Sequence, residues 1–224
     1  MDTTLADPSR TLLPPTPPVP ASSLPLATAG LRLGPTLGEG GLGVIQLAHQ
    51  DLLGRDVAVK RLKRGSTTDA LARLLHEARM MGCLEHPNVP PVHAVGVDPE
   101  GTPVLVMKRV DGDVWRPGGD LEDDVRVLIA VTDALLHAHE RGVVHRDLKP
   151  ANVMRGAHGV VYLVDWGAAW PAGDTAEVAG TPAFMAPEMY AVGPAAPSMD
   201  TWARSFSRAS SASDFEPHPP TPTR

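Results

Sequence analysis

The order of apolar and polar positions predicts that strands predominate in the first half of the chain. Short apolar runs bounded by Gly, Pro or charged residues predict strands over residues 37–48, 56–60, 92–97 and 103–107. Leu and Ala recur at helical spacing between the second and third of these runs, which predicts a helix over residues 68–84. Ser66, Thr67 or Thr68 can cap the start of this helix, because a side-chain oxygen there accepts a main-chain N–H.

The second half of the chain changes to a helical pattern. Residues 121–141 have a helix-forming composition, and Gly142 is a natural C-cap. The apolar face expected for this helix consists of Leu121, Val125, Leu128, Leu135 and Leu136. Two short strands are predicted over residues 153–154 and 160–164, and residues 197–203 have the pattern of a helix start.

The two ends of the chain have a different composition. Residues 1–30 are rich in Pro, Thr, Ser and Ala, and Pro, which lacks a main-chain donor, blocks regular helix and sheet. We expect a disordered leader there, although its P-x-x-P spacing is also typical of segments that dock on an aromatic groove of a partner. Residues 204–224 are rich in Ser and Pro, and we expect a disordered tail.

Composition and charge narrow the class of protein. A hydrophobic content of 42% and a charged content of 21% are those of a soluble globular chain, and a net charge of −6 disfavours nucleic acid as a partner. The single Cys83 excludes an intrachain disulfide and fits a reducing cytoplasm. No apolar run approaches the roughly 18 residues of a membrane span, and the first residues lack the pattern of a signal peptide. We therefore expect a cytoplasmic protein without a membrane span.

The stretch from His145 to Asn152 carries most of the candidate chemistry. Within it Asp147 can accept a hydroxyl proton, Lys149 can neutralise a phosphate oxygen, and Asn152 can offer an oxygen to a divalent cation. A His-Arg-Asp triplet also occurs by chance in surface loops. The meaning of the stretch therefore depends on the other motifs of the chain.

A glycine-rich turn lies near the start of the predicted sheet. Glycines at 38, 40 and 43 let the main chain approach phosphate groups, although a plain glycine-rich hairpin has the same pattern. A dinucleotide-binding fold would continue with a helix, whereas this chain continues with a strand over residues 56–60 that ends on Lys60. A lone strand lysine is usually a solvated edge residue, so only its pairing with the glycine turn points to a nucleotide-phosphate loop.

Six motifs stand in the order found in protein kinases, and the chain resembles eukaryotic-like serine/threonine protein kinases over about residues 31–202. The motifs are the glycine turn, the strand Lys60, the helix Glu77, His145–Asn152, Asp165-Trp166-Gly167 and Ala186-Pro187-Glu188. The residues in and around these motifs are most similar to those of the bacterial branch. Lys149, two residues after Asp147, fits the serine/threonine class. Trp166 stands where the family usually has Phe, and it can still fill an apolar slot.

The resemblance implies an α+β protein-kinase fold with two lobes. It places the kinase domain at residues 31–203, with a β-rich N-lobe containing one helix over 31–107, a hinge over 108–112 and a partial C-lobe over 113–203. The C-lobe is expected to be mostly helical and incomplete after about residue 203, because the apolar helix that begins near Asp200 does not continue in the sequence. A frameshift, a truncated gene or an error in the gene model would each produce such a change.

The resemblance also implies roles for individual residues. Asp147 is the expected catalytic base, assisted by Lys149, Lys60 and Glu77, and Asn152 with Asp165 is expected to hold Mg²⁺. The residues expected to bind ATP are Leu37, Gly38, Glu39, Gly40, Gly41, Leu42, Gly43, Ile45, Ala58, Lys60, Met107 and Val110.

Regulation is expected in the segment between Asp165 and Glu188, where Thr175 and Thr181 are the residues with aliphatic hydroxyl groups. Thr181 matches the family position that bonds to the catalytic Asp and Lys, so Thr175 remains as the candidate activating phosphosite. Arg146 is expected to pair with phosphorylated Thr175 through a bidentate contact.

Two functions remain open from the sequence. The first is an ATP-dependent kinase that phosphorylates Ser and Thr residues of protein substrates. The alternative is a non-catalytic kinase-like fragment that binds nucleotide or a partner, for instance through the Pro-rich leader. The complete set of catalytic residues favours the first function, and the missing C-lobe helices favour the second.

Overall fold

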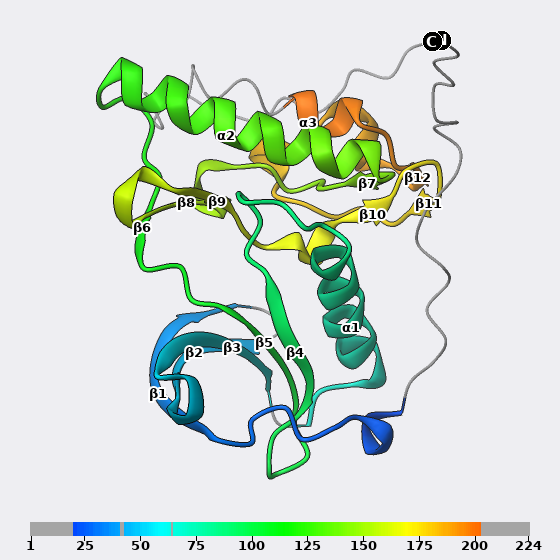
Figure 1. The fold of residues 1–224 in the computed structure, drawn as a ribbon. Helices are drawn as coiled ribbons and strands as arrows, with labels where there is room; N and C mark the ends of the chain where they lie inside the picture. Colours follow the sequence, from blue (N-terminus) through cyan, green and yellow to red (C-terminus); the bar gives the residue numbers. More distant parts are fainter. Residues whose placement is uncertain (1–19, 41–42, 64, 203–224) are drawn as a thin grey trace, which may run out of the picture. The chain divides into compact units, whose positions relative to one another are not determined.

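The computed structural model describes residues 20–40, 43–63 and 65–202. The described chain divides into two compact units, residues 20–111 and residues 112–202, and Figure 1 shows the elements of each. This division falls within the expected hinge. Among the described residues, no helix has both the length and the apolar character that crossing a bilayer requires.

The first unit is built on an antiparallel sheet of five strands in the order β1-β2-β3-β5-β4. The strands are β1 (Leu31–Glu39), β2 (Gly43–Gln50), β3 (Arg55–Leu62), β4 (Val92–Val97) and β5 (Pro103–Lys108). Their inward side chains form one apolar cluster of Ala48, Val57, Val59, Val104 and Val106. Because neighbouring positions of a strand point to opposite faces, Val57 and Val59 share a face, and so do Val104 and Val106.

One helix, α1 (Thr68–Gly82), packs along β4 and β5 of this sheet (Figure 1). The Thr67 hydroxyl accepts a hydrogen bond from the Ala70 N–H, so the N-cap is one of the three residues expected from the sequence. Leu74, Ala78 and Met81 are buried at helical spacing. The predicted helix is therefore confirmed, with its end two residues earlier than expected.

Residues 20–30 differ from the expected disordered leader, because they lie along the free edge of β4. The Ala27 N–H donates to Val97 O, and the Val97 N–H donates to Pro25 O, each at 2.9 Å. A Cβ atom at Gly96 would lie 2.1 Å from Pro25 O, so only glycine lets the segment dock. An open strand edge has unpaired main-chain groups, and this segment pairs some of them. Residues 1–19, including most of the Pro-rich stretch, lie outside the described residues.

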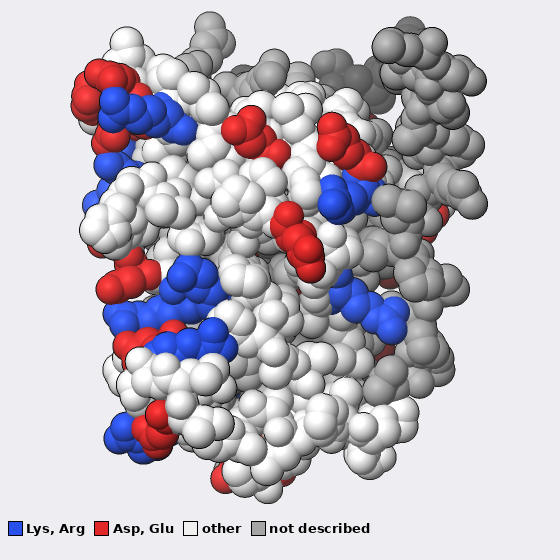
Figure 2. Space-filling view, viewed as in Figure 1, with Lys and Arg blue, Asp and Glu red and all other residues white. Residues whose placement is uncertain are grey.

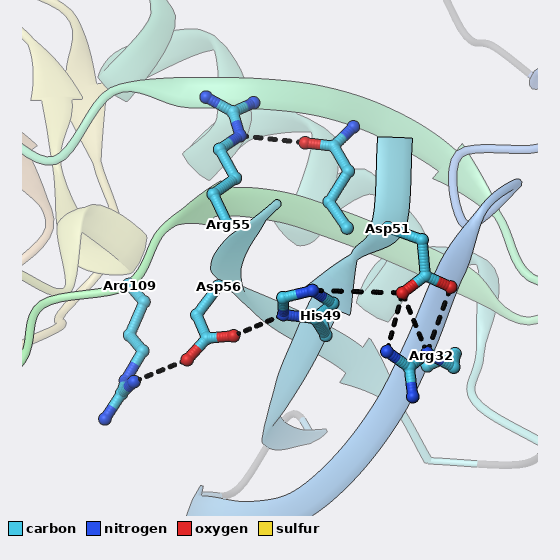
Figure 3. Close-up of polar contacts among 7 residues, drawn as sticks. Arg32, His49, Asp51, Arg55, Asp56 and Arg109 are labelled. Carbon is cyan, nitrogen blue, oxygen red and sulfur yellow. Dashed lines mark hydrogen bonds and ion pairs between the residues drawn. The ribbon is translucent and has the colours of Figure 1, made fainter. Parts of the chain in front are cut away.

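An exposed row of charges connects the strands of the first unit on one face (Figure 3). Arg32 pairs with Asp51 at 2.7 Å, His49 lies 2.9 Å from Asp56, and Arg109 pairs with Asp56 at 2.7 Å. The hydrogen bond from Arg32 holds the pKa of Asp51 below its ordinary value, and that from His49, followed by the charge of Arg109, lowers the pKa of Asp56. Figure 2 shows acidic and basic side chains next to one another.

The second unit contains one long helix and several short strands. The helices are α2 (Leu121–Glu140) and α3 (Ser198–Trp202), which ends where the described residues end. Strand β8 (Val153–Gly156) lies between β6 (Gly112–Val114) and β9 (Val161–Leu163). Two smaller ladders pair β7 (Val143–Val144) with β10 (Trp170–Pro171), and β11 (Thr175–Ala176) with β12 (Gly193–Pro194). The expected tail, residues 204–224, lies outside the described residues.

The buried face of α2 is not the face expected from the sequence. The structure buries Val127, Val131, Ala134, Leu135 and Ala138. Of the five residues expected to form the apolar face, only Leu135 is buried, and the other four are at least 38% exposed. The helix is apolar on more than one side, so its periodicity alone could not identify the inward face.

Trp115 fixes the turn that leads into α2. Its side chain is 2% exposed, and its indole N–H donates to Asp124 Oδ1 at 2.8 Å. Asp124 Oδ2 accepts the main-chain N–H of Gly118, also at 2.8 Å. A buried aromatic side chain with a satisfied indole donor is a stable anchor, so this short segment is ordered without a helix of its own.

Replacement of Leu135 by Ala should lower the free energy of unfolding by about 2–4 kcal/mol, because it opens a cavity beneath α2. The matched variant Leu136→Ala, which truncates a 55% exposed neighbour, should cost less than about 1 kcal/mol. Urea denaturation of both variants measures the difference. Equal losses would mean that the described inward face of α2 is wrong.

Asp56→Asn should lower the melting temperature at neutral pH and lose its effect in acid. The carboxyl pKa of Asp56 is depressed from 3.8, so its contacts stabilise the folded chain above that value and are lost as pH falls through the lower folded pKa. Melting scans from pH 7 to pH 2 should show the difference between the two proteins shrinking as pH falls below about 4. Asp133→Asn, at an exposed position of α2, is the control, and a difference of unchanged size at the acid end of the scan would contradict the prediction.

Candidate active site

The stretch His145–Asn152 follows β7 and is anchored by the carboxylate of Asp200. Asp200 is 1% exposed and accepts the main-chain N–H groups of His145, at 2.8 Å, and Arg146, at 2.7 Å. Its Oδ2 atom also lies 2.8 Å from His139 Nε2. Arg146 has a φ angle of +66°, a backbone conformation that residues other than Gly rarely adopt. The bonds to Asp200 therefore hold a strained residue immediately before Asp147.

Asp147 is the centre of a cluster of hydrogen-bond donors. Lys149 Nζ lies 2.7 Å and Asn152 Nδ2 lies 3.1 Å from Asp147 Oδ2, and the Thr181 N–H donates to Oδ1 at 2.8 Å. Lys149 also donates to Thr181 Oγ1 at 2.6 Å. The structure thus brings together four residues that the sequence assigned to the site. The carboxylate has a fixed direction and neighbours that stabilise negative charge.

Asn152 and Asp165 have the donor atoms that a hard cation requires. The Asn152 amide nitrogen bonds to Asp147 O at 2.8 Å, so its amide oxygen is the atom that faces other partners. Asn152 O accepts the N–H of Val164 at 2.8 Å, which ties the residue before Asp165 to the His145–Asn152 stretch. No group of three His, Cys, Asp or Glu side chains suited to a metal occurs among the described residues. Mg²⁺ often uses only one or two carboxylates with substrate phosphates, so this pair fits it.

The Asp165-Trp166-Gly167 turn is packed against the His145–Asn152 stretch. Trp166 is 0% exposed, and its ring meets the His145 ring edge-on, with centroids 4.6 Å apart at 68°. Its indole N–H donates to Leu163 O at 3.0 Å. The sequence predicted that Trp would fill an apolar slot, but it did not predict this bond. The only signal for it was the replacement of Phe, which has no donor, by Trp.

Lys60 and Glu77 form a buried ion pair in the first unit. Lys60 Nζ lies 2.7 Å from both carboxylate oxygens of Glu77, which is 2% exposed. The two residues come from β3 and from the third turn of α1, 17 positions apart. An ion pair with this little exposure to water is held firmly, because removing either partner leaves the other charge in a site with little hydration. The structure therefore brings together the lysine and the glutamate that the sequence assigned to one site.

The glycines of the predicted phosphate loop have different surroundings. A Cβ atom at Gly43 would lie 2.1 Å from Arg61 O, so glycine there is required by the packing of β2 on β3. Among the described residues, none has an atom within 4 Å of such a Cβ at Gly38 or Gly40, which favours access of a ligand to their main chain. Gly41 and Leu42 lie outside the described residues. Only part of the glycine pattern is therefore explained by the sheet itself.

The other described residues predicted to bind ATP lie in the same sheet, except Val110. Ile45 on β2 is paired with Lys60, and Ala58 on β3 is paired with Met107 on β5. Leu37 is 49% exposed near the end of β1. The structure also shows Glu39 paired with Lys63 at 3.0 Å, whereas Val110 follows β5 as a partly buried residue.

Arg146 and Thr175 are not in contact in the described structure. The Arg146 guanidinium donates to Ala168 O, at 3.4 Å, and to Glu177 O. Burial lowers the pKa of Arg146, and the charge of Asp200 raises it in part. Thr175 is exposed on β11, opposite Pro194. The expected phosphosite is therefore accessible, and its expected partner is bound to main-chain carbonyl groups.

Comparison with known proteins gives a family. The family model described as protein kinase domain matches residues 31–219, most of the chain. The probable serine/threonine-protein kinase SCO3848 of Streptomyces coelicolor is 38% identical over 175 residues, which cover 70% of this chain and 26% of that protein. The probable serine/threonine-protein kinase PknB of Bifidobacterium longum is 34% identical over 193 residues, covering 75% of this chain and 28% of the relative.

A third relative covers more of the chain. The serine/threonine-protein kinase PknK of Mycobacterium tuberculosis is 35% identical over 207 residues, or 88% of this chain and 18% of that protein. This chain therefore spans less than a third of the length of each of these relatives. All three relatives are bacterial proteins, as the residues of the motifs predicted.

Asp200→Ala should destabilise the chain by about 3–5 kcal/mol, because it removes a buried acceptor from two main-chain N–H groups and from His139. Asp133→Ala, at an exposed position of α2, should change stability by less than about 0.5 kcal/mol. Urea denaturation measures both losses. Comparable values for the two variants would show that Asp200 does not anchor the loop.

Proposed function

Because the chain belongs to the protein kinase family, we propose that it transfers the γ-phosphoryl group of ATP to Ser and Thr hydroxyl groups of proteins. The observation that carries this proposal is the cluster around Asp147. The Asp147 carboxylate accepts hydrogen bonds from Lys149, Asn152 and Thr181. These bonds hold it in one direction beside the Lys149 ammonium group. This is the arrangement that a hydroxyl acceptor and an incoming phosphoryl group require.

Asp147 orients the acceptor hydroxyl and takes its proton as the oxygen attacks. Lys149, 2.7 Å from Asp147 Oδ2, offsets the negative charge that develops on the transferred group. Thr181 holds both side chains, because its main-chain N–H bonds to Asp147 and its hydroxyl accepts from Lys149. Most of the rate acceleration is then a matter of position and charge rather than of covalent chemistry.

The first unit supplies the groups that bind the nucleotide. Lys60, fixed by Glu77, contacts the phosphates of ATP, and the accessible main chain at Gly38 and Gly40 covers them. Leu37, Ile45, Ala58, Met107 and Val110 contact the rest of the nucleotide. Buried apolar residues with few polar groups are typical of such sites.

Asn152 and Asp165 hold Mg²⁺, with the Asn152 oxygen and the Asp165 carboxylate as its ligands. The cation, when bound with ATP, neutralises charge on the phosphate oxygens. The main-chain bond between Val164 and Asn152 keeps the two ligand-bearing segments together. The contribution of the chain is therefore to present two oxygen donors on fixed backbone.

Thr175 is the proposed activating phosphosite, and Arg146 its partner. Phosphorylation would place a charge of about −2 on an exposed side chain. Arg146 would then exchange its neutral carbonyl partners, Ala168 and Glu177, for a phosphate, which binds a guanidinium more strongly. The activating step is thus a change of partner at Arg146.

Asp147→Asn should lower the phosphorylation rate by at least about 100-fold, because the variant keeps the shape of the site but loses the base. The affinity for ATP should stay within about twofold, because Asp147 does not contact the nucleotide in this scheme. Incubation with Mg²⁺, labelled ATP and a mixed library of Ser and Thr peptides measures the rate, and calorimetry measures the affinity.

Asp133→Asn, at an exposed position of α2, is the matched control and should retain full activity. Unchanged phosphorylation in Asp147→Asn would contradict the assigned base. Wild-type chain that binds ATP but transfers no phosphate would favour the non-catalytic alternative.

A further inference from the structure

We propose that Trp166 is a positioning residue that locks the backbone of Asp165 by closing a hydrogen-bonded ring around it. The proposal deepens the proposed function, because Asp165 is there a ligand of Mg²⁺. The bond that closes the ring runs from the Trp166 indole N–H to Leu163 O, at 3.0 Å. Phe, which the protein kinase family usually has at this position, lacks an N–H donor and cannot form this bond.

The backbone of Asp165 needs such a lock. Its φ and ψ angles are +61° and +68°, in the left-handed region that residues other than Gly rarely adopt. A conformation of this kind persists only where the surroundings impose it. The bond between Trp166 and Leu163 spans Val164 and Asp165, so it restricts the main-chain angles of both residues at once.

The indole ring is itself fixed from several directions. It is 0% exposed, and it packs edge-on against His145 at a centroid distance of 4.6 Å. His145 Nε2 lies 3.3 Å from Val164 O, and the Val164 N–H donates to Asn152 O at 2.8 Å. Val164 lies inside the hydrogen-bonded ring, and both its carbonyl oxygen and its N–H are therefore bound to the His145–Asn152 stretch.

The lock acts by raising the fraction of molecules in which the Asp165 carboxylate is placed for a cation. A Phe side chain would fill most of the same slot and still meet His145, but the turn would be free to adopt other conformations at Asp165. The apparent affinity for a cation falls in proportion to the fraction of molecules that present the carboxylate correctly. Trp166 should therefore affect metal binding more than it affects nucleotide binding without metal.

The test compares the full chain with its Trp166→Phe variant. Mn²⁺, observed by electron paramagnetic resonance, is the probe, in the presence of a non-hydrolysable ATP analogue. We expect the dissociation constant for Mn²⁺ to rise about fivefold, the effect of losing one ordinary hydrogen bond. The affinity for the analogue without metal should stay within about twofold.

Trp115→Phe is the matched control. Trp115 is also a buried tryptophan of the second unit, and its indole N–H donates to Asp124 rather than to the Asp165 turn. This variant should lose a similar amount of stability in urea denaturation and leave the Mn²⁺ affinity unchanged. Where the wild-type chain binds Mn²⁺ with the analogue, an equal loss of Mn²⁺ affinity in both variants, or no loss in either, would overturn the lock.

A second measurement separates the lock from the proposed function. Hydrogen exchange of the Val164 main-chain N–H, which donates to Asn152 O, should be about fivefold faster in Trp166→Phe and unchanged in Trp115→Phe. Unchanged exchange in Trp166→Phe would exclude the lock whether or not metal binds. Faster exchange in a chain that never binds Mn²⁺ with nucleotide would keep the lock and refute the proposed Mg²⁺ site.

Discussion

The carboxylate of Asp200 is the interaction on which the second unit depends. It is nearly inaccessible to water and accepts two consecutive main-chain N–H groups of the His145–Asn152 stretch. Bonds from main-chain donors to a buried carboxylate are short and strong, and they compensate its loss of hydration. They also hold Arg146 in a left-handed conformation, which turns the chain so that Asp147 meets Lys149 and Thr181.

Shared partners also fix the backbone around Asp165, the proposed ligand of the cation. His145 contacts Trp166 with its ring and Val164 with Nε2, while its main-chain N–H is held by Asp200. The backbone of Asp165 is thus connected through His145 to the anchor of Asp147. In the proposed scheme, in which Asp147 is a base and Asp165 a metal ligand, shared supports keep the mutual geometry that catalysis by positioning requires. In the first unit, the ion pair with Glu77 fixes the Lys60 side chain in a similar way.

Local signals predicted much of the fold and the site. Helix α1 was predictable because its cap and its buried Leu74, Ala78 and Met81 lie within one periodic segment. The Asp147 cluster was predictable because Lys149 and Asn152 are two and five residues away, so that any compact loop brings them close. The inward face of α2 was not predictable, since the helix is apolar on several sides and only its neighbours decide which side is covered.

The sequence by itself determined the identity of the chemical groups and their order along the chain, because those depend on residue type and short spacing. Tertiary structure alone decided which distant groups meet. Residues 20–30 pair with β4 because Gly96 leaves room for them, and Arg146 meets Glu177 O rather than Thr175. The Trp166 ring meets the His145 ring only because the Asp165-Trp166-Gly167 turn folds back on the His145–Asn152 stretch. Such contacts depend on the packing of whole elements, and no local pattern of residues encodes that packing.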